Sequence, residues 1–306
     1  MEKFTARYHL PGLFEFFDFY SVFLPLFYSR REYFYDWCEI ASIYGAPAGC
    51  IWNGGRTGFS GAEEASAKKV LNLLKKYGIS ARLTFSNSLL RKEHLSDRKC
   101  NGICRLFEGK NSKIKNGIIV HSEILLDYLK ERYPNFYFVS STTKVITDFD
   151  KFIGELNRKD FSFVVPDFRL NKSLERLEFL TSEQKSKVEF LSNECCWTGC
   201  KERKICYENV SRKNLGDDKD FSEHICRSPG GKDGYVFSKA MKNPAFIGTE
   251  EIKNIYLPLG FSNFKIEGRG LGSAMILEFL LYYMTKPEYQ LNVREAVYLD
   301  SMLDLF

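Results

Sequence analysis

The feature that most constrains this chain of 306 residues is a regular alternation of short apolar runs with amphipathic segments. Each unit has a β-branched or aromatic run, a polar turn, and a stretch with apolar residues three and four positions apart, the spacing of one helix face. Near-continuous apolar strands that alternate with helices are typical of a parallel sheet. The runs predicted as strands are Thr5 to Leu10, Ile43 to Ile51, Ala81 to Phe85, Gly117 to His121, Phe136 to Ser140, Phe161 to Val165, Lys187 to Leu191 and Phe264 to Glu267.

The helical patterns fall between these strands. They cover Ala62 to Tyr77, Ser122 to Tyr133, Lys172 to Leu180, Thr249 to Leu257 and Gly270 to Met284. Ser122, Asn171 and Thr249 stand where helix-capping residues are expected. Since no repeat, low-complexity tract or linker separates two halves, we predict one domain over residues 1–306, an α/β fold of the TIM-like (β/α) barrel type.

One segment interrupts the alternation. Residues 207–235 are polar and contain four glycines, and they follow the seventh predicted strand. Long connections of this kind inside a compact domain are often functional. We predict a loop insertion here that, with the residues before it, carries cysteines.

Composition excludes some functions and leaves others open. The hydrophobic share of 44% and the charged share of 27% are ordinary for a globular protein. A net charge of +5, with basic and acidic residues interspersed, does not by itself point to nucleic acid, and it does not exclude it. The start of the sequence lacks a signal-like apolar core, and the Phe-rich stretch from Leu10 to Tyr28 contains Glu15 and Asp18. We predict a cytoplasmic protein without membrane contact, in which this stretch is a core helix.

Candidate site residues lie directly after the predicted strands, because the active sites of (β/α) barrels form at the carboxyl ends of their strands. Imidazole and carboxylate groups can transfer protons, so the predicted catalytic residues are His121, Asp167, Glu194 and Glu267. Amides and guanidinium groups can hold a polar or anionic substrate, so the predicted substrate-binding residues are Asn53, Arg56, Asn87, Arg169, Asn193 and Arg269. Each of them could instead be a cap or turn residue.

Five of the nine cysteines lie between positions 195 and 226. Thiolates bind soft metals, and four of them complete a tetrahedral site. Cys196 and Cys200 are four positions apart and can share one helix face. Cys195 and Cys196 cannot easily both bind one ion, and Cys196 is preferred because it completes this spacing. The predicted metal ligands are Cys196, Cys200, Cys206 and Cys226.

The identity of the bound group stays open at this point. Both zinc and a [4Fe–4S] cluster accept four thiolates, and the spacing does not separate them. Free cysteines are also commonly buried as small apolar residues, so these thiols could serve packing alone.

A resemblance narrows the choice. The run Phe264-Lys265-Ile266-Glu267-Gly268-Arg269, preceded by Gly260-Phe261, resembles the KIEGR signature of the collagenase-like peptidases, the thirty-second family of peptidases of unknown catalytic type. The order of Tyr235-Val236-Phe237-Ser238, a helix near Glu250, a glycine and the last strand is similar to that of the family, as is a cysteine-rich turn after the preceding strand. The resemblance covers about the last 120 residues, and the rest of the chain fits through its strand order.

The resemblance implies a barrel core and, as in relatives that act in ubiquinone biosynthesis and RNA uridine hydroxylation, a four-cysteine [4Fe–4S] cluster. Other members of the family are peptidases. Carried onto this sequence, it implies Cys196, Cys200, Cys206 and Cys226 as ligands, and Glu267 and Arg269 as site residues.

We therefore predict a metal- or [4Fe–4S]-dependent enzyme that modifies a small molecule or nucleobase, for example by hydroxylation without oxygen. An electron donor would then be a partner. Two alternatives remain: a peptidase-like hydrolase with a structural zinc, and a non-catalytic binding subunit stapled by a metal.

Overall fold

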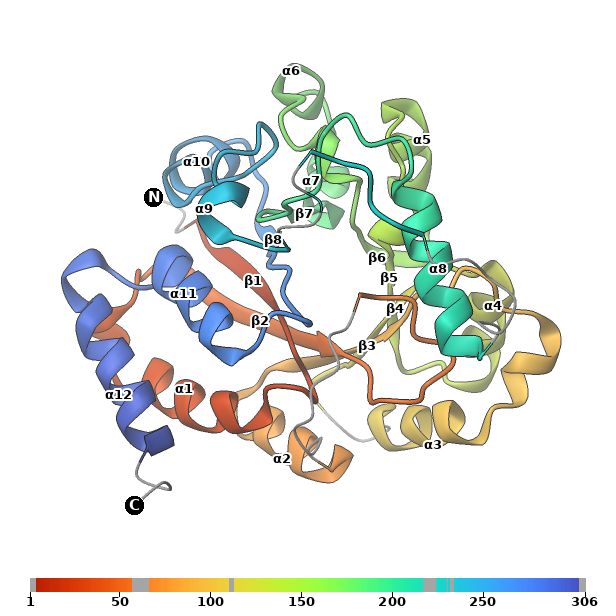
Figure 1. Cartoon of the computed structure of the whole chain (residues 1–306), viewed down its shortest axis with the longest axis horizontal. Coiled ribbons are helices and arrows are strands. Elements are labelled where there is room, and N and C mark those ends of the chain that lie inside the picture. Colours follow the sequence, from red (N-terminus) through yellow and green to blue (C-terminus); the bar gives the residue numbers. More distant parts are fainter. Residues whose placement is uncertain are drawn as a thin grey trace.

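A computed structural model describes residues 4–56, 66–109, 113–216, 224–229, 231 and 234–302 of the chain. Eight parallel strands form one sheet in the order β6-β5-β4-β3-β2-β1-β8-β7 (Figure 1). A single parallel bridge between Val164 and Val188 joins the two edges, so the sheet is a nearly closed, TIM-like barrel. The strands are β1 (Ala6–Pro11), β2 (Cys38–Gly45), β3 (Ser80–Phe85), β4 (Gly117–Val120), β5 (Tyr137–Ser140), β6 (Phe161–Val164), β7 (Glu189–Leu191) and β8 (Asn263–Lys265).

The α/β barrel predicted from the sequence is confirmed, and each predicted strand overlaps an observed one. The largest displacement is at β2, which was predicted to begin at Ile43 and begins at Cys38. Residues 38–40 pair with β1, although Glu39 interrupts their apolar pattern. The strand ends at Gly45, two positions before Pro47, which has no N–H group to donate to a neighbouring strand.

Helices surround the strands (Figure 1). They are α1 (Phe17–Ser29), α2 (Ala67–Tyr77), α3 (Arg98–Phe107), α4 (Glu123–Arg132), α5 (Phe149–Leu156), α6 (Leu174–Leu177), α7 (Ser182–Lys187), α8 (Arg203–Leu215), α9 (Phe237–Ala240), α10 (Thr249–Glu251), α11 (Ser273–Met284) and α12 (Gln290–Met302). The predicted core helix near the start corresponds to α1, whose Tyr20, Phe23, Leu24 and Phe27 are buried. In the described part of the chain, no helix is both long and apolar enough to cross a membrane.

Three predicted helices differ in extent. The pattern from Lys172 to Leu180 yields only the single turn of α6, and the pattern from Thr249 to Leu257 forms α10 followed by a π-helical turn at Ile252–Tyr256. Helix α2 begins at Ala67, where the Ser66 hydroxyl accepts a hydrogen bond from the Lys69 N–H. Positions 62–65 of the helix predicted there lie outside the described residues.

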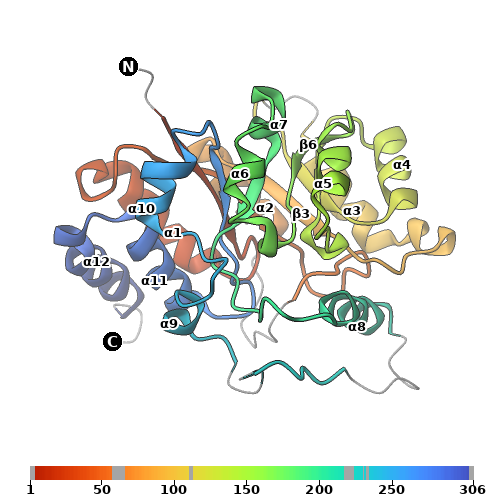
Figure 2. The same ribbon diagram turned by 90° about the horizontal axis from the view of Figure 1, so that it is seen from above.

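The predicted loop insertion needs a correction. Its first part, residues 207–215, belongs to α8, because Arg203, Tyr207 and Ser211 lie one turn apart and are all buried. The polar composition of α8 concealed this helix, since its inward side chains are mostly polar. In Figure 2, α8 lies across one end of the barrel and not alongside the strands.

The barrel interior contains a buried ionic cluster. Glu189 on β7 is ion-paired with Arg82 on β3, and its other oxygen lies 3.4 Å from Nζ of Lys265 on β8. His9 Nε2 on β1 lies 3.5 Å from the same carboxylate. Arg82 also donates to the Tyr137 hydroxyl at 2.9 Å. A buried charge is tolerated when it is paired and hydrogen-bonded, and these contacts supply both conditions.

The cluster shifts the pKa values of its members. Burial would raise the pKa of Glu189, but the charge of Arg82 and the other cations lowers it to about 2. Burial, aided by Arg82, lowers the pKa of His9 to about 3, so this imidazole is neutral at physiological pH. Burial also lowers the pKa of Lys265, to about 8, against the opposing effect of Glu189. The Glu189 carboxylate therefore faces two basic groups that carry charge near pH 7, Arg82 and Lys265, and the neutral His9.

We expect Glu189→Gln to destabilise the fold by about 3–5 kcal/mol, because it leaves Arg82 buried without a counter-charge. Urea denaturation at pH 7 measures the loss. Glu183→Gln on α7 is the matched control, since its exposed side chain makes only a surface pair with Lys187, and it should change stability little. Equal losses in both variants would contradict a central role for the cluster.

The neutral His9 predicts a defined pH dependence. Its folded-state pKa is lowered from 6.5 to about 3, so the unfolded chain binds a proton in this window that the folded chain does not. Stability should therefore fall as pH drops below 6.5, by up to about 1.4 kcal/mol per pH unit from this group. In His9→Gln that contribution disappears. Urea titrations between pH 7.5 and about 5 test it, and parallel slopes for both proteins would refute it.

Candidate active site

The carboxyl ends of the strands open into one cavity of about 710 Å³. Residues that follow the strands form one wall, and α8 with its flanking segments forms the other. The residues that line it include Tyr44, Arg56, Thr84, Ser86, Cys195, Cys196, Trp197, Cys200, Arg203, Cys206, Tyr207, Cys226, Tyr235, Asn243, Lys265, Glu267 and Arg269. A concave site of this size at this end of a barrel is where substrate binding is expected.

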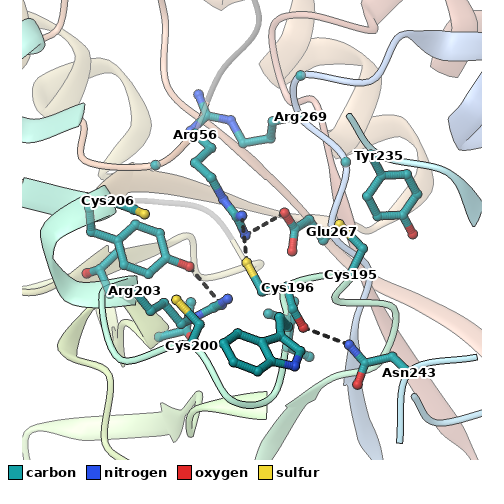
Figure 3. A pocket seen from close by; sticks show the side chains of 18 of the residues that line it. Arg56, Cys195, Cys196, Cys200, Arg203, Cys206, Tyr235, Asn243, Glu267 and Arg269 are labelled. Atoms are coloured by element: carbon teal, nitrogen blue, oxygen red, sulfur yellow. Dashed lines mark hydrogen bonds and ion pairs between the residues drawn. The ribbon is translucent and has the colours of Figure 1, made fainter. Parts of the chain in front are cut away.

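Arg56 stands at the centre of the cavity wall. Its Nη2 lies 2.7 Å from Glu194 Oε2. The same nitrogen lies 2.6 Å from Glu267 Oε1, and Nη1 donates to the Cys196 sulfur at 3.4 Å (Figure 3). The turn before it fits closely against the end of β3, because a Cβ at Gly54 would come within 2.3 Å of the Ser86 carbonyl oxygen. A glycine is therefore required to place this arginine.

Glu194 is a buried, ionised carboxylate. Its Oε2 accepts from Arg56 and, at 2.6 Å, from Arg203 Nη2, while its Oε1 accepts from the backbone N–H groups of Cys195 and Cys196. Burial opposes ionisation, but the charges of Arg203 and Arg56 hold its pKa well below the usual range. Glu194 therefore fixes the cysteine turn and the two arginines and has no spare lone pair for catalysis.

Asp167 holds Arg203 and Arg169 in position. It is fully buried, it accepts from Arg169 Nε at 2.6 Å, and its Oδ2 lies 3.2 Å from Arg203 Nε. Arg169 in turn donates to the Cys200 carbonyl oxygen at 2.8 Å. The predicted catalytic Asp167 and substrate-binding Arg169 thus have visible positioning contacts with α8 and with the cysteine turn.

Glu267 is the carboxyl group in this site with an unusual ionisation. Its Oε1 binds Arg56, and its buried Oε2 receives no hydrogen bond from any described residue. Burial raises its pKa to about 8; Arg56 opposes the rise and the negative charge of Glu194 reinforces it. At neutral pH this carboxyl can hold or release a proton at the cavity surface.

Three side chains fix the backbone around Glu267 and Glu194. Asn193 accepts from the Glu267 N–H at 2.7 Å and donates to its carbonyl oxygen at 3.1 Å. Tyr235 donates its hydroxyl proton to the Asn193 carbonyl oxygen at 2.9 Å, and Asn243 donates to the carbonyl oxygens of Glu194 and Cys196. The predicted substrate-binding Asn193 is committed to this framework.

The remaining predicted residues have different placements. Arg269 lines the cavity and is ion-paired with Glu15 at 2.8 Å, and it also donates to Asn53 Oδ1 at 3.1 Å. Asn87 donates to backbone oxygens of Ile51 and Ser211, outside the cavity lining. His121 is not among the residues that line the cavity. Its Nδ1 is 2.9 Å from the Thr143 hydroxyl, and burial lowers its pKa to about 4.

All four predicted metal ligands line this one cavity, and all nine cysteines of the chain are free thiols. Burial raises the pKa of Cys206, and the neighbouring thiols of Cys200 and Cys226 raise it further, so these three groups are close enough to interact. Burial raises the pKa of Cys196 to about 12. Within the described ranges, no three His, Cys, Asp or Glu side chains stand together in a ready ion-binding group.

Several cavity residues were not predicted. Tyr207 lies on α8 inside the segment expected to be a loop, and Lys265 belongs to a predicted strand and was not considered as a site residue. Thr84 and Ser86 also line the cavity, and their buried hydroxyl groups have no hydrogen-bond partner in the described structure. The alternation within a strand offered a signal for Lys265, because it lies two positions before Glu267 and so on the same face.

The fold and site define an α/β barrel with a cysteine-lined cavity at the carboxyl ends of its strands. No protein-family model matches the chain, and no curated protein matches it. A solved structure titled "The Structure of the U32 Peptidase Mk0906" is similar, with a TM-score of 0.51 and 13% identity, over 86% of this chain and 93% of that one. At this identity the match shows a shared fold, which agrees with the resemblance seen in the sequence.

The contacts around Glu267 predict two opposite pKa shifts. Arg56→Gln removes a cation that favours the ionised form, so the pKa of Glu267 should rise above about 8. Glu194→Gln removes a neighbouring negative charge, so the pKa of Glu267 should fall. Each shift should reach about one unit or more. A ¹³C NMR titration of glutamate-labelled protein measures them, with Glu267→Gln to assign the signal. Shifts of the same sign in both variants would disprove this account.

Proposed function

We propose that this chain is an enzyme that transfers a proton to or from a small polar molecule or nucleobase in the cavity, with Glu267 as its acid–base group. The observation that carries the proposal is the position of Glu267: its carboxyl faces the cavity, is held by Arg56 at 2.6 Å, and has a pKa raised to about 8. An acid–base catalyst works best when its pKa lies near the working pH.

The other residues have assigned roles in this proposal. Arg56 orients the Glu267 carboxyl, and Glu194 with Arg203 holds Arg56 in place. Trp197, Tyr207 and Tyr235 offer aromatic faces in the lining, which suit a planar ring such as a nucleobase. A volume of about 710 Å³ accommodates a ligand of that size.

The thiols extend the proposal to a cofactor. Cys196, Cys200, Cys206 and Cys226 line the same cavity and form a soft donor set that fits a [4Fe–4S] cluster, and zinc is the competing occupant. Their side chains would have to turn toward one point to bind it, since they do not yet form a ligand group. Such a cluster would supply electron transfer or Lewis acidity there, and an electron donor would then be required.

The similar solved structure supports a second candidate, because its title names a peptidase. In a hydrolase, Glu267 in its ionised form would take a proton from water, and Arg56 and Arg269 would attract a carboxylate of the substrate. The thiols would then hold a structural zinc. The two proposals differ in metal, and so one preparation separates them.

We expect anaerobically purified protein to be brown, with a broad absorption band near ~400 nm and about four irons per chain. Cys200→Ser and Cys206→Ser should each lose the band and most of the iron, because each removes one proposed ligand. Cys195→Ser is the matched control, since Cys195 lines the same cavity and is not a proposed ligand, and it should keep both. Circular dichroism verifies the fold of each variant.

Each alternative outcome has a definite meaning. Colourless protein with one zinc, lost in the same two variants, would replace the cluster with the hydrolase proposal. Absence of any metal from wild-type protein, or equal metal content in all three variants, would remove these thiols from the site. The acid–base role is tested separately, by whether Glu267 titrates near pH 8.

A further inference from the structure

Lys265 lies at the floor of the cavity and has no part in the chemistry assigned to Glu267. It ends β8, lines the cavity, and is almost fully buried. Its Nζ lies 3.8 Å from the centre of the Tyr44 ring and 3.4 Å from Glu189 Oε1. It therefore occupies the boundary between the ionic core of the barrel and the space where a ligand would bind.

The ion pair of Lys265 is incomplete. Glu189 is the carboxylate that contacts it, and this group is already paired more closely with Arg82. Loss of the proton from Lys265 thus leaves an electrically balanced Arg82–Glu189 pair. This charge balance agrees with the lowering of its pKa to about 8, at which about one amine in ten is neutral at pH 7.

A second observation points to a ligand at the same place. Thr84 and Ser86 line the cavity, and their hydroxyl oxygens are buried and have no hydrogen-bond partner in the described structure. A buried hydroxyl without a partner is unfavourable by roughly 1–3 kcal/mol. Rotation about the Cα–Cβ bond of each residue would bring its hydroxyl to an oxygen atom of a small molecule whose carbon skeleton lies against Tyr44 and Leu191.

We propose that Lys265 is a nucleophile that binds a small polar aldehyde or ketone covalently, as an imine, on the cavity floor. The inference rests on the proposed function only in taking this cavity as the substrate site, and it requires neither a metal nor catalysis by Glu267. It assigns the class of substrate: a carbonyl compound with at least one further oxygen atom.

The neutral Nζ attacks the carbonyl carbon, a C–N bond forms, and the carbonyl π electrons move to the oxygen. The nitrogen gives up one of its two protons and the oxygen takes one up, which gives a neutral carbinolamine. The hydroxyl is then protonated and leaves as water while the nitrogen lone pair forms the C=N bond, and loss of the remaining N–H proton gives the imine. Water can supply the proton that the hydroxyl takes up, as can the carboxyl group of Glu267, which lines the same cavity.

Reductive trapping tests the proposal directly. Wild-type protein is incubated at pH 7 with glycolaldehyde or with pyruvate and sodium cyanoborohydride, which reduces an imine to a stable secondary amine. Peptide mapping by mass spectrometry then locates the adduct. We expect Lys265 to be labelled at least about tenfold faster than surface lysines, because at an ordinary pKa near 10.4 roughly a hundredfold less of the amine is neutral.

Matched variants complete the experiment. Lys265→Met should abolish the fast adduct, whereas Lys239→Arg and Lys242→Arg, which change two other lysines of the cavity lining, should retain it. Preferential labelling of Lys239 or Lys242, or labelling of Lys265 no faster than that of surface lysines with both probes, would overturn the proposal. Site mapping on wild-type protein gives this answer even if Lys265→Met does not fold.

The result is separable from that of the proposed function. Metal content and the titration of Glu267 are measured without a carbonyl compound. If trapping fails while Glu267 titrates near pH 8, only the imine proposal is overturned. Trapping at Lys265 without metal and without a titration of Glu267 near pH 8 would retain the imine and overturn the proposed function.

Discussion

The ion pair between Arg82 and Glu189 is the interaction on which the barrel depends most. Strand β7 lies at one edge of the sheet, and its contact with β6 at the other edge is limited to the bridge between Val164 and Val188. Backbone pairing therefore secures β7 on one side only. The Glu189 side chain compensates by reaching across the interior to β3, where Arg82 is buried against Phe163 and Tyr137. Charge inside the barrel thus joins β7 to β3, on a distant part of the sheet.

A second set of charges stands above the first, at the carboxyl ends of the strands. Glu194 draws Arg56 and Arg203 together, and Asp167 fixes Arg203 from the other side. The two carboxylates Glu194 and Glu267 contact one guanidinium group of Arg56, so only one of them is stabilised fully as an anion. In the first set of charges, Lys265 has the corresponding position, because it shares the Glu189 carboxylate with Arg82. Each level of the barrel thus contains one group whose pKa is shifted toward the neutral form, raised for Glu267 and lowered for Lys265.

Much of the fold could be predicted from the sequence, because strands of a parallel barrel are apolar on both faces and their runs stand out between polar turns. The position of Glu267 after the last strand followed from the same reasoning. The set Cys196, Cys200, Cys206 and Cys226, which lines one cavity, was predicted from the spacing of the thiols and from the family resemblance. Helix α8 could not be predicted, since Arg203 and Ser211 are polar residues buried by specific hydrogen bonds and ion pairs. Nor could the sequence show that Asn193 and Asp167 support the site, because their partners lie far along the chain or on other elements.

Helix α8 shapes the cavity but takes no part in the pairing of the strands. This helix contributes Arg203 and Tyr207 to the cavity, while Ser211 and Asn214 bind the backbone after β3 and β2. The eight strands do not need it to pair with one another. Substitutions at Tyr207, which lines the cavity and takes no part in strand pairing, would therefore reshape the wall and leave the barrel as it is. Arg203 differs, because the buried carboxylates of Asp167 and Glu194 depend on its charge, and so one helix contains both an adaptable position and a fixed one.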